Sequence, residues 1–464
     1  MGGMTPEDAV LRAAEAALPD GALVTDPDVM ATYSRDRSTG SDVGEPIAVA
    51  FPRTVEQVSA LLAAAHEHRV PVVPRGAGSG LSGGSNAVDG SLVVCVERMN
   101  RVLEVDEADG YVETEPGVLN QDLRDHVRRH DLWYAPDPAS KEFCSIGGNV
   151  STNAGGLCCV KYGVTREAVL GLEVVLADGR VTRLGRRTVK GVAGYDLTAL
   201  LVGSEGTLGI VTRARLRLRP IPAPPTTAVA VFEGIGAAGR AVERIMAVCS
   251  PSILEILDRT TIAAVEAFMP MGLDASAGAL LIAQSDLPGD AGGHEADLLL
   301  AECERAGATE SYRSEDPQQA DMLLGARRMA IPAFEAMGDW LLDDISVPRR
   351  RLADAVERIE RIAVERRVVI GTFGHAGDGN LHPTIVTPRG DTDAAARALL
   401  AFDDILEVAL ALGGTVTGEH GVGLLKRSAL ARELDPVAID LHVRVKDAFD
   451  PRGILNPGKA LPRW

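Results

Sequence analysis

The spacing of apolar residues along the chain predicts helices that alternate with short strands. Residues 54–68 place apolar side chains at 55, 58, 61, 62 and 65, on one face of an α-helix. Four apolar runs are typical of buried strands: Val70–Val73, Ser91–Val96, Leu172–Leu176 and Ala228–Phe232. Residues 236–248 again favour a helix. The chain therefore mixes both kinds of element throughout.

A proline-rich segment, Leu218–Pro225, separates two patterned regions and is typical of a linker. At 464 residues the chain is also too long for a single hydrophobic core. We therefore expect one domain over residues 1–220 and a second over residues 221–464.

The second domain contains a predicted β-hairpin. Val368–Phe373 and Leu381–Val386 are strand-like, and Asp378-Gly379 between them is a favoured two-residue turn. This turn would place His375 directly opposite His382, with Cβ atoms roughly 4.5–5.5 Å apart. Two imidazoles at that separation can share one cation.

A third metal ligand is available in Gly418-Glu419-His420-Gly421, which follows a short β-rich run at residues 414–417. Two histidines and one carboxylate leave coordination positions open, as in catalytic rather than structural metal sites. We therefore predict that His375, His382 and Glu419 hold a divalent metal, with zinc as the first choice. The alternative is a surface hairpin with two solvated histidines.

Glycine is abundant, at 49 residues, and three glycine clusters precede residue 210. The first, Pro74–Gly84, contains a formal G-x-G-x-x-G. The dinucleotide-binding form of this motif must open a helix, but the next predicted strand follows almost at once. A strand–loop–strand of this kind can instead present backbone N–H groups to a pyrophosphate. The alternative is a glycine-rich turn without a ligand.

The other two clusters are Pro136–Gly156 and Gly203–Val211. Small residues let the backbone approach a flat ligand, and the asparagine and threonine side chains of the second cluster can direct hydrogen bonds. Three such loops within about 140 residues predict a long ligand that carries phosphate, sugar and ring.

Composition argues against several kinds of partner, location and cofactor. A net charge of −18 and 4% aromatic residues argue against a nucleic-acid partner. The sequence has no run of eighteen apolar residues and no basic-then-apolar segment at its start, so we expect a soluble, cytoplasmic protein without a transmembrane segment. Six cysteines without C-x-x-C spacing do not indicate an iron–sulfur cluster. If the chain transfers electrons, it would therefore pass them to a partner or to a diffusing acceptor.

The three glycine clusters and the stretch Lys190–Ile210 resemble the FAD domain of the vanillyl-alcohol oxidase/p-cresol methylhydroxylase superfamily. The histidine hairpin, Glu419-His420 and the terminal Asn456–Lys459 are similar to its FAD-linked 2-hydroxy-acid dehydrogenase branch. That branch includes D-lactate dehydrogenases, D-2-hydroxyglutarate dehydrogenases and the catalytic subunit of bacterial glycolate oxidase. The resemblance implies an α+β, two-domain PCMH-type FAD-binding fold. A C-terminal α+β substrate domain would cover the flavin, and the tail 454–464 would return to it.

The resemblance also implies a set of cofactor-binding residues. These are Arg75, Gly76, Ala77, Gly78, Ser79, Gly80, Pro138, Gly148, Asn149, Thr152, Asn153, Gly156, Glu205, Gly209, Ile210 and Asn456. Relatives with a covalent flavin carry a histidine in the first loop, where this chain has Ser79. We therefore expect FAD to be bound non-covalently.

The implied activity is FAD- and metal-dependent oxidation of a D-2-hydroxy acid to the 2-oxo acid. His420 is the expected general base, since it adjoins a predicted metal ligand and histidine titrates near neutrality. The alternative for His420 is a hydrogen bond that supports a ligand. Arg327 is the expected carboxylate clamp. Its alternatives are the neighbouring Arg328 as the clamp, or an exposed helix arginine without that role. Asn380 either orients substrate or holds the turn.

The expected substrate is lactate, glycolate or a longer monocarboxylate. Dicarboxylate-specific members of the family tend to carry a lysine just before a segment like Asp344–Pro348, where this chain has Leu341, Leu342 and Asp343. The expected acceptor is external: a quinone, an iron–sulfur subunit, a cytochrome or an electron-transfer flavoprotein. A homodimer is compatible with the sequence. The alternatives are a flavin subunit of a larger glycolate-oxidase-type complex, an ether-lipid-synthase type of transferase, and a nicotinamide-dependent dehydrogenase.

Overall fold

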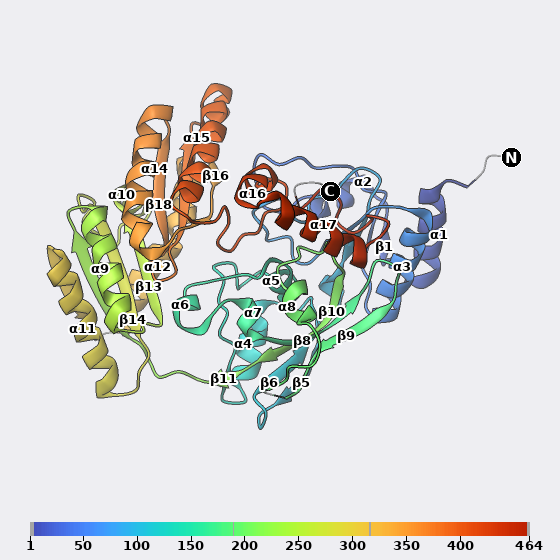
Figure 1. The fold of residues 1–464 in the computed structure, drawn as a ribbon, viewed down its shortest axis with the longest axis horizontal. Helices are drawn as coiled ribbons and strands as arrows, with labels where there is room; N and C mark the ends of the chain where they lie inside the picture. The colour runs from blue at the N-terminus through green and yellow to red at the C-terminus, as the bar shows by residue number, and fades with distance from the viewer. Residues whose placement is uncertain (1–3, 189, 315–316, 462–464) are drawn as a thin grey trace. The chain divides into compact units, whose positions relative to one another are not determined.

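The computed structural model describes residues 4–188, 190–314 and 317–461. The chain forms two compact units (Figure 1). Unit 1 contains the residues up to Gly155, Val164–Ile221 and the residues from Glu419 onward, and unit 2 contains Gly156–Gly163 and Pro222–Gly418. The division near residue 221 adjoins the expected one. Two segments group differently from the expectation: residues 156–163 lie in unit 2, and residues 419–453 join the tail in unit 1.

Unit 1 is built on two main sheets. One has the strand order β1 (Leu23–Val24), β2 (Ala48–Ala50), β4 (Leu92–Cys95), β3 (Val72–Arg75). The other has the order β5 (Val102–Asp106), β6 (Tyr111–Thr114), β10 (Ile210–Arg217), β8 (Val169–Val175), β9 (Val181–Gly185). A small pair joins β7 (Leu132–Trp133) to β11 (Arg219–Pro220). The helices are α1 (Pro6–Ala17), α2 (Pro27–Tyr33), α3 (Val55–His68), η1 (Val96–Arg98), α4 (Asn120–Arg128), α5 (Ile146–Thr152), α7 (Thr165–Ala168), α8 (Leu197–Leu201), α16 (Arg427–Glu433) and α17 (Pro436–Phe449).

Helix α3 confirms the helix predicted from apolar spacing. The hydroxyl of Thr54 accepts a hydrogen bond from the backbone N–H of Gln57 and so caps the first turn. The buried face consists of Val58, Leu61, Leu62 and Ala65, and the helix ends at Arg69 in the left-handed region (φ 56°). This face packs in a core that it shares with strands β2 and β4.

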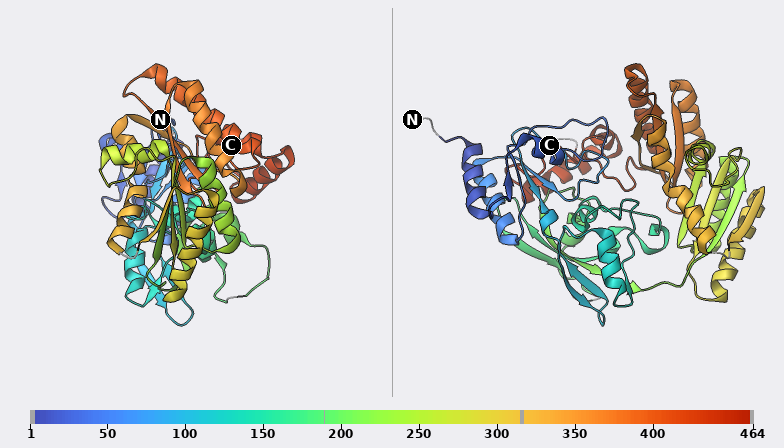
Figure 2. Two further views of the ribbon diagram at one scale, coloured as in Figure 1. Left: turned by 90° about the vertical axis from the view of Figure 1, so that its left-hand side faces the viewer. Right: turned by 180° about the vertical axis from the view of Figure 1, so that it is seen from behind.

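The C-terminal segment belongs to unit 1 because buried polar contacts hold it there. Lys446 of α17 is 1% exposed, and its ammonium donates to the backbone oxygens of Thr207 (2.7 Å) and Leu455 (2.8 Å) and to the carboxylate of Asp450 (2.5 Å). Leu455 in turn bridges to Val72 of β3. Figure 2 shows these red C-terminal helices beside the blue N-terminal elements of the same unit. Opposite ends of the chain therefore complete one core.

Unit 2 is built on a single large sheet. Its strand order is β15 (Glu310–Ser314), β12 (Thr226–Phe232), β14 (Ala279–Ser285), β13 (Ile253–Asp258), β18 (Val369–His375), β19 (Asn380–Thr387), β16 (Asp339–Leu342), with β17 (Ile345–Ser346) also paired to β19. The helices are α6 (Cys159–Tyr162), α9 (Ile235–Val248), α10 (Arg259–Phe268), α11 (Asp290–Ala306), α12 (Pro317–Arg328), α13 (Ala330–Met337), η2 (Arg349–Arg351), α14 (Leu352–Arg366) and α15 (Thr392–Ala411). Helices α11, α9, α14 and α15 contact one another in that order along the sheet (Figure 1). Within the described ranges, no helix is both long and apolar enough to cross a membrane.

The predicted hairpin exists, but its predicted register is wrong. Strands β18 and β19 pair His375 with Asn380 and Phe373 with His382, and residues 376–379 form the turn. The turn is longer than predicted because the backbone N–H of Asp378 bonds to the oxygen of His375 (3.0 Å). His375 and His382 are therefore diagonal neighbours on one face of the sheet rather than directly opposed.

Candidate active site

The two hairpin histidines come together in unit 2. Their ring centroids are 5.2 Å apart, with the ring planes at 86°, and the residues are 5% and 3% exposed. The diagonal register still allows this approach, because side chains two positions apart on a strand share a face. A solvated surface hairpin is thus excluded, and a buried imidazole pair takes its place.

A buried carboxylate connects His375 to Arg327. One oxygen of Glu255 lies 2.6 Å from Nδ1 of His375, and the other accepts from Nε of Arg327 at 2.6 Å. Burial alone would raise the pKa of Glu255, but His375 and Arg327 hold it below its ordinary value, so the carboxylate stays ionised. Arg327 is itself buried, and its guanidinium lies over the Phe373 ring, 4.4 Å from the centroid.

Asn380 holds the backbone beside this pair. Its amide nitrogen donates to the carboxylate of Asp344 (2.7 Å) and to the backbone oxygen of Ile345 (2.9 Å). Of the two roles expected for Asn380, these contacts favour the structural one. Asp344 also accepts from the hydroxyl of Thr417 (2.7 Å) and from the backbone N–H of Gly418 (2.9 Å). Asp344 therefore fixes the last residue of unit 2, to which Glu419 is directly bonded.

Glu419 and His420 open the C-terminal part of unit 1. The backbone oxygen of His420 accepts from the hydroxyl of Ser82 (3.0 Å), and Nε2 of His420 lies 3.5 Å from a Glu419 carboxylate oxygen. Both side chains are partly exposed. The place of Glu419 in a metal site with the unit 2 histidines stays a prediction.

The histidine pair fits a divalent transition metal. Imidazole nitrogen is a ligand that zinc and its neighbours prefer, and metal-bound histidines usually donate their second ring nitrogen to a carboxylate. Glu255 occupies that position for His375. The donors of unit 2 thus match the chemistry that the metal prediction requires.

The first glycine loop of unit 1 fits a pyrophosphate. The loop follows β3 directly, and the structure places no helix between Arg75 and β4, as predicted. A side chain on Gly76 would collide with the hydroxyl of Ser145, and one on Gly78 (φ +68°) would collide with the guanidinium of Arg75. That guanidinium is buried and donates to the backbone oxygen of Arg35 (2.8 Å). Small residues beside a fixed cation are what a close-lying diphosphate needs.

Replacing Gly78 with alanine is expected to weaken FAD retention roughly tenfold to a hundredfold. The methyl group would displace the Arg75 guanidinium, and the bidentate phosphate contact predicted for that side chain would contribute about 1.5–3 kcal/mol. Equilibrium dialysis of free FAD against the apoprotein measures this. The matched control is Gly90→Ala, at φ +70° with no atom within 4 Å of the added carbon. Equal losses in both variants would assign the effect to backbone strain alone.

The second glycine cluster is partly helical rather than a loop. Ile146–Thr152 forms α5, which the Ser145 hydroxyl caps. The carboxamide oxygen of Asn149 accepts from Asn120 (3.0 Å), and the Thr152 hydroxyl donates to the backbone oxygen of Gly148 (3.1 Å). Asn153 ends the helix in the left-handed region, and its oxygen accepts from the N–H of Arg166.

Three further predicted cofactor residues pack in the protein interior. The side chain of Ile210 lies in the core of unit 1. Gly209 lies against β8, where an added carbon would be 3.0 Å from the oxygen of Val175. Pro138 is buried, and its backbone oxygen accepts a hydrogen bond from the backbone N–H of Lys141. Gly156 is assigned to unit 2, as the first residue of the segment Gly156–Gly163.

Glu205, Asn456 and Lys459 form a buried network beside the first loop. Glu205 accepts the backbone N–H groups of Val422 and Gly423, each at 2.8 Å. The amide of Asn456 donates to the backbone oxygens of Gly84 (2.8 Å) and Glu205 (2.7 Å). Burial raises the pKa of Glu205 and lowers the pKa of Lys459 to about 7. This network ties the tail to the glycine loops.

Sequence reasoning did not single out Glu255, Asp344 or Lys459 as site residues. Glu255 had a detectable signal, because it interrupts the apolar run Ile253–Leu257, where a charge must be paired when buried. Asp344 lies in the segment Asp344–Pro348, which bears on substrate specificity, and Lys459 lies in the segment Asn456–Lys459, which carries the family resemblance. Their roles depend on contacts with distant segments.

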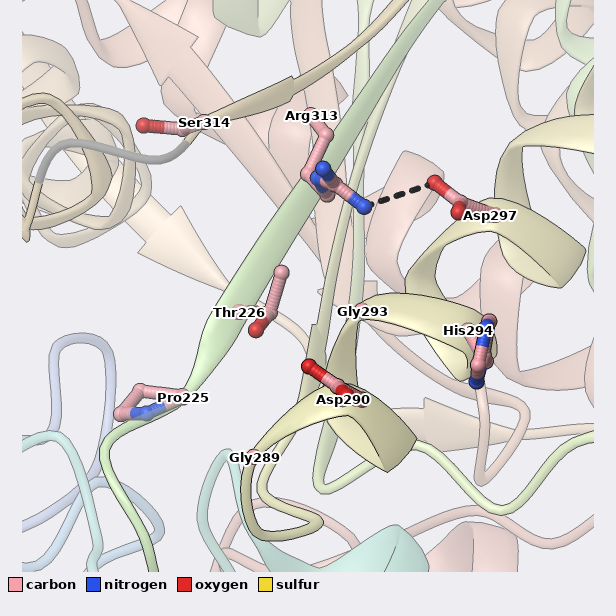
Figure 3. A pocket seen from close by; sticks show the side chains of 9 residues that line it. All are labelled: Pro225, Thr226, Gly289, Asp290, Gly293, His294, Asp297, Arg313 and Ser314. Atoms are coloured by element: carbon pink, nitrogen blue, oxygen red, sulfur yellow. Dashed lines mark hydrogen bonds and ion pairs between the residues drawn. The ribbon is translucent and has the colours of Figure 1, made fainter.

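A separate hollow of about 420 Å³ lies at the start of α11 (Figure 3). It is lined by Pro225, Thr226, Gly289, Asp290, Gly293, His294, Asp297, Arg313 and Ser314. Arg313 pairs with Asp297 at 3.0 Å. None of the predicted site residues lines this hollow, so it is distinct from the histidine site.

Two family models match the chain. The FAD binding domain model covers residues 46–185, and the model of the C-terminal domain of FAD linked oxidases covers residues 221–460. The glycolate oxidase subunit GlcD of Bacillus subtilis is 44% identical over 92% of this chain and 91% of its own length. The D-lactate dehydrogenase of Anaerostipes hadrus is 33% identical over 93% of this chain and 91% of its own.

Solved structures confirm the predicted fold class. p-Cresol methylhydroxylase aligns with a TM-score of 0.79 and 18% identity over 98% of this chain and 96% of its own. 4-Ethylphenol oxidase from Gulosibacter chungangensis aligns with a TM-score of 0.79 and 21% identity over 98% and 97%. At these identities the likeness concerns the fold alone.

Proposed function

Since the chain belongs to the FAD-linked oxidases, we propose that it oxidises a D-2-hydroxy monocarboxylate to the 2-oxo acid. The supporting observation is the buried pair His375–His382 in the same unit as the buried guanidinium of Arg327. A metal-binding pair and a carboxylate-binding cation are the two features that a 2-hydroxy acid requires. Two of the relatives are named for glycolate and for D-lactate.

In the proposed reaction the substrate loses a proton from its hydroxyl and a hydride from Cα. When bound, FAD would supply the hydride acceptor at N5, and a divalent metal, zinc in our proposal, would supply Lewis acidity toward the hydroxyl. His375, His382 and Glu419 would hold the metal. His420 takes the hydroxyl proton, and Arg327 orients the carboxylate.

The segment that precedes Asp344–Pro348 supports a monocarboxylate. Leu341 and Leu342 of β16 are buried, and the next two residues, Asp343 and Asp344, are buried acids. A second substrate carboxylate at this segment would meet no lysine that could pair with it. Lactate, glycolate or a longer apolar 2-hydroxy acid fits better than a dicarboxylate.

Arg327→Ala is expected to lower kcat/KM about a hundredfold, because a bidentate pair of charge-assisted hydrogen bonds contributes about 3 kcal/mol. Arg328→Ala is the matched control, since Arg328 is the next residue and is exposed. Steady-state kinetics with an artificial acceptor dye compares the two. Loss of activity in the Arg328 variant alone would show that Arg328, and not Arg327, binds the substrate carboxylate.

Anaerobic mixing of the metal-loaded protein with D-lactate, L-lactate, glycolate and D-2-hydroxyglutarate tests the function directly. We expect one D-acid or glycolate to bleach the flavin absorbance, and a chelator to abolish the bleaching. A yellow protein that none of the acids bleaches would contradict the proposal.

A second candidate is the same chemistry within a larger complex. The GlcD relatives of Bacillus subtilis and Escherichia coli are named as subunits, and they match 92% and 90% of this chain. A chain that needs partners would reduce its flavin normally but would turn over slowly with simple dyes. The physiological acceptor would then be reached through an iron–sulfur subunit, a cytochrome, a quinone or an electron-transfer flavoprotein.

A further inference from the structure

We propose that Glu255 is a positioning residue that couples the metal site to the substrate clamp. Its carboxylate would set the ring orientation of His375 and the guanidinium orientation of Arg327 from one point. The inference rests on the proposed function and assigns to this site a residue outside the expected ligands, base and clamp.

The placement of Glu255 follows from strand pairing. Glu255 lies on β13 directly opposite His375 on β18, and it is 0% exposed. Its neighbours on the strand, Leu254 and Ile256, are apolar and buried. The carboxylate cannot reach water, so both of its oxygens depend on their two partners, each at 2.6 Å.

The contact with His375 selects one tautomer of the ring. An ionised carboxylate only accepts hydrogen bonds, so Nδ1 of His375 must carry the proton. The lone pair then resides on Nε2, which is the nitrogen that remains to bind a metal. Without Glu255, the ring could adopt either tautomer and could rotate.

The contact with Arg327 orients the guanidinium in the same way. Glu255 engages Nε, and the ring of Phe373 lies against the guanidinium carbon at 4.4 Å. A planar group held at one edge and against one face has a fixed direction. The two terminal nitrogens then point away from Nε, in the fork that a substrate carboxylate matches.

A purely structural role explains this arrangement less well. Replacing a buried ion pair or triad with apolar residues is often neutral or stabilising, so a buried charged triad is weak evidence for a role in stability. Asp258, on the same strand, shows the structural alternative. Its carboxylate accepts the backbone N–H groups of Thr261 and Thr372, each at 2.8 Å. Glu255 instead bonds two side chains that have predicted chemical roles.

The test compares Glu255→Gln with Asp258→Asn in the FAD-loaded protein. Zn²⁺ affinity is measured by competition with a chelating dye, and the substrate dissociation constant by anaerobic stopped-flow reduction of the flavin. We expect Glu255→Gln to weaken both affinities tenfold to a hundredfold. Asp258→Asn should lower the melting temperature and leave both affinities within twofold. Glu255→Asp, which retains the charge, should recover part of one of the two affinities, either that for Zn²⁺ or that for substrate.

A second measurement needs no variant of Glu255. In metal-free protein labelled with ¹⁵N-histidine, the ring of His375, assigned by its loss in His375→Ala, should carry its proton on Nδ1. A proton on Nε2 would overturn the inference even if the Glu255 variants do not fold.

The outcomes separate the inference from the proposed function. A wild-type protein that binds Zn²⁺ and is bleached by a hydroxy acid, with Glu255→Gln unchanged in both affinities, overturns the inference alone. A wild-type protein that no hydroxy acid bleaches overturns the proposed function, whereas weaker Zn²⁺ binding in Glu255→Gln would still support the role of Glu255 toward His375.

Discussion

Replacing His382 with alanine is expected to slow flavin reduction by three to four powers of ten. A metal that lowers the pKa of a bound hydroxyl lowers the reaction barrier by several kcal/mol, and the variant would lack one of the two buried imidazoles proposed to bind that metal. Anaerobic stopped-flow spectroscopy of the zinc-loaded variant measures the rate. Chelator-treated wild-type protein should show the same loss and should recover when Zn²⁺ is restored.

The control for this experiment is His294→Ala, an exposed histidine in the same unit. That variant should reduce its flavin at the wild-type rate. A His382→Ala rate within tenfold of wild type would show that the reaction does not depend on a metal at the histidine pair.

His420→Ala is expected to lower the flavin reduction rate about a thousandfold, within the usual range for loss of a general base. The substrate dissociation constant and the zinc content should change little, because this role concerns a proton and not a ligand. Stopped-flow titration and metal analysis separate these quantities. His442→Ala, an exposed histidine of α17, serves as the control. If His420→Ala loses zinc instead, His420 supports a ligand rather than acting as the base.

The parts of the fold that depend on local signals were predictable. Helix α3 needed only apolar spacing and the Thr54 cap, and the absence of a helix after the first glycine loop followed from the nearby strand. The sequence predicted correctly that His375 and His382 lie together, but the predicted strand register was wrong. Turn preference favoured Asp378-Gly379 alone, whereas β18 is also paired with β13, and β17 holds the start of β19.

The parts that depend on distant contacts were not predictable in the same way. Nothing near Glu255 in the sequence indicates that Arg327 and His375 will meet its carboxylate. The return of the chain to unit 1 was expected only from residue 454, because the bonds from Lys446 to Thr207 and from Glu205 to Val422 join segments without a shared pattern. Long-range pairing of charges leaves little trace in local composition.

The late completion of unit 1 has a consequence for biosynthesis. The amide of Asn456 closes on the backbone of Gly84, 372 positions earlier in the chain. A ribosome that has made the whole of unit 2 therefore still carries an FAD-binding unit that lacks its last helices. Because domains fold as their residues emerge, unit 2 is expected to acquire protease resistance first. Nascent chains that stop before α16 should resist proteolysis over residues 222–418 but fail to retain FAD, so the cofactor would be held only after residues 419–456 have emerged.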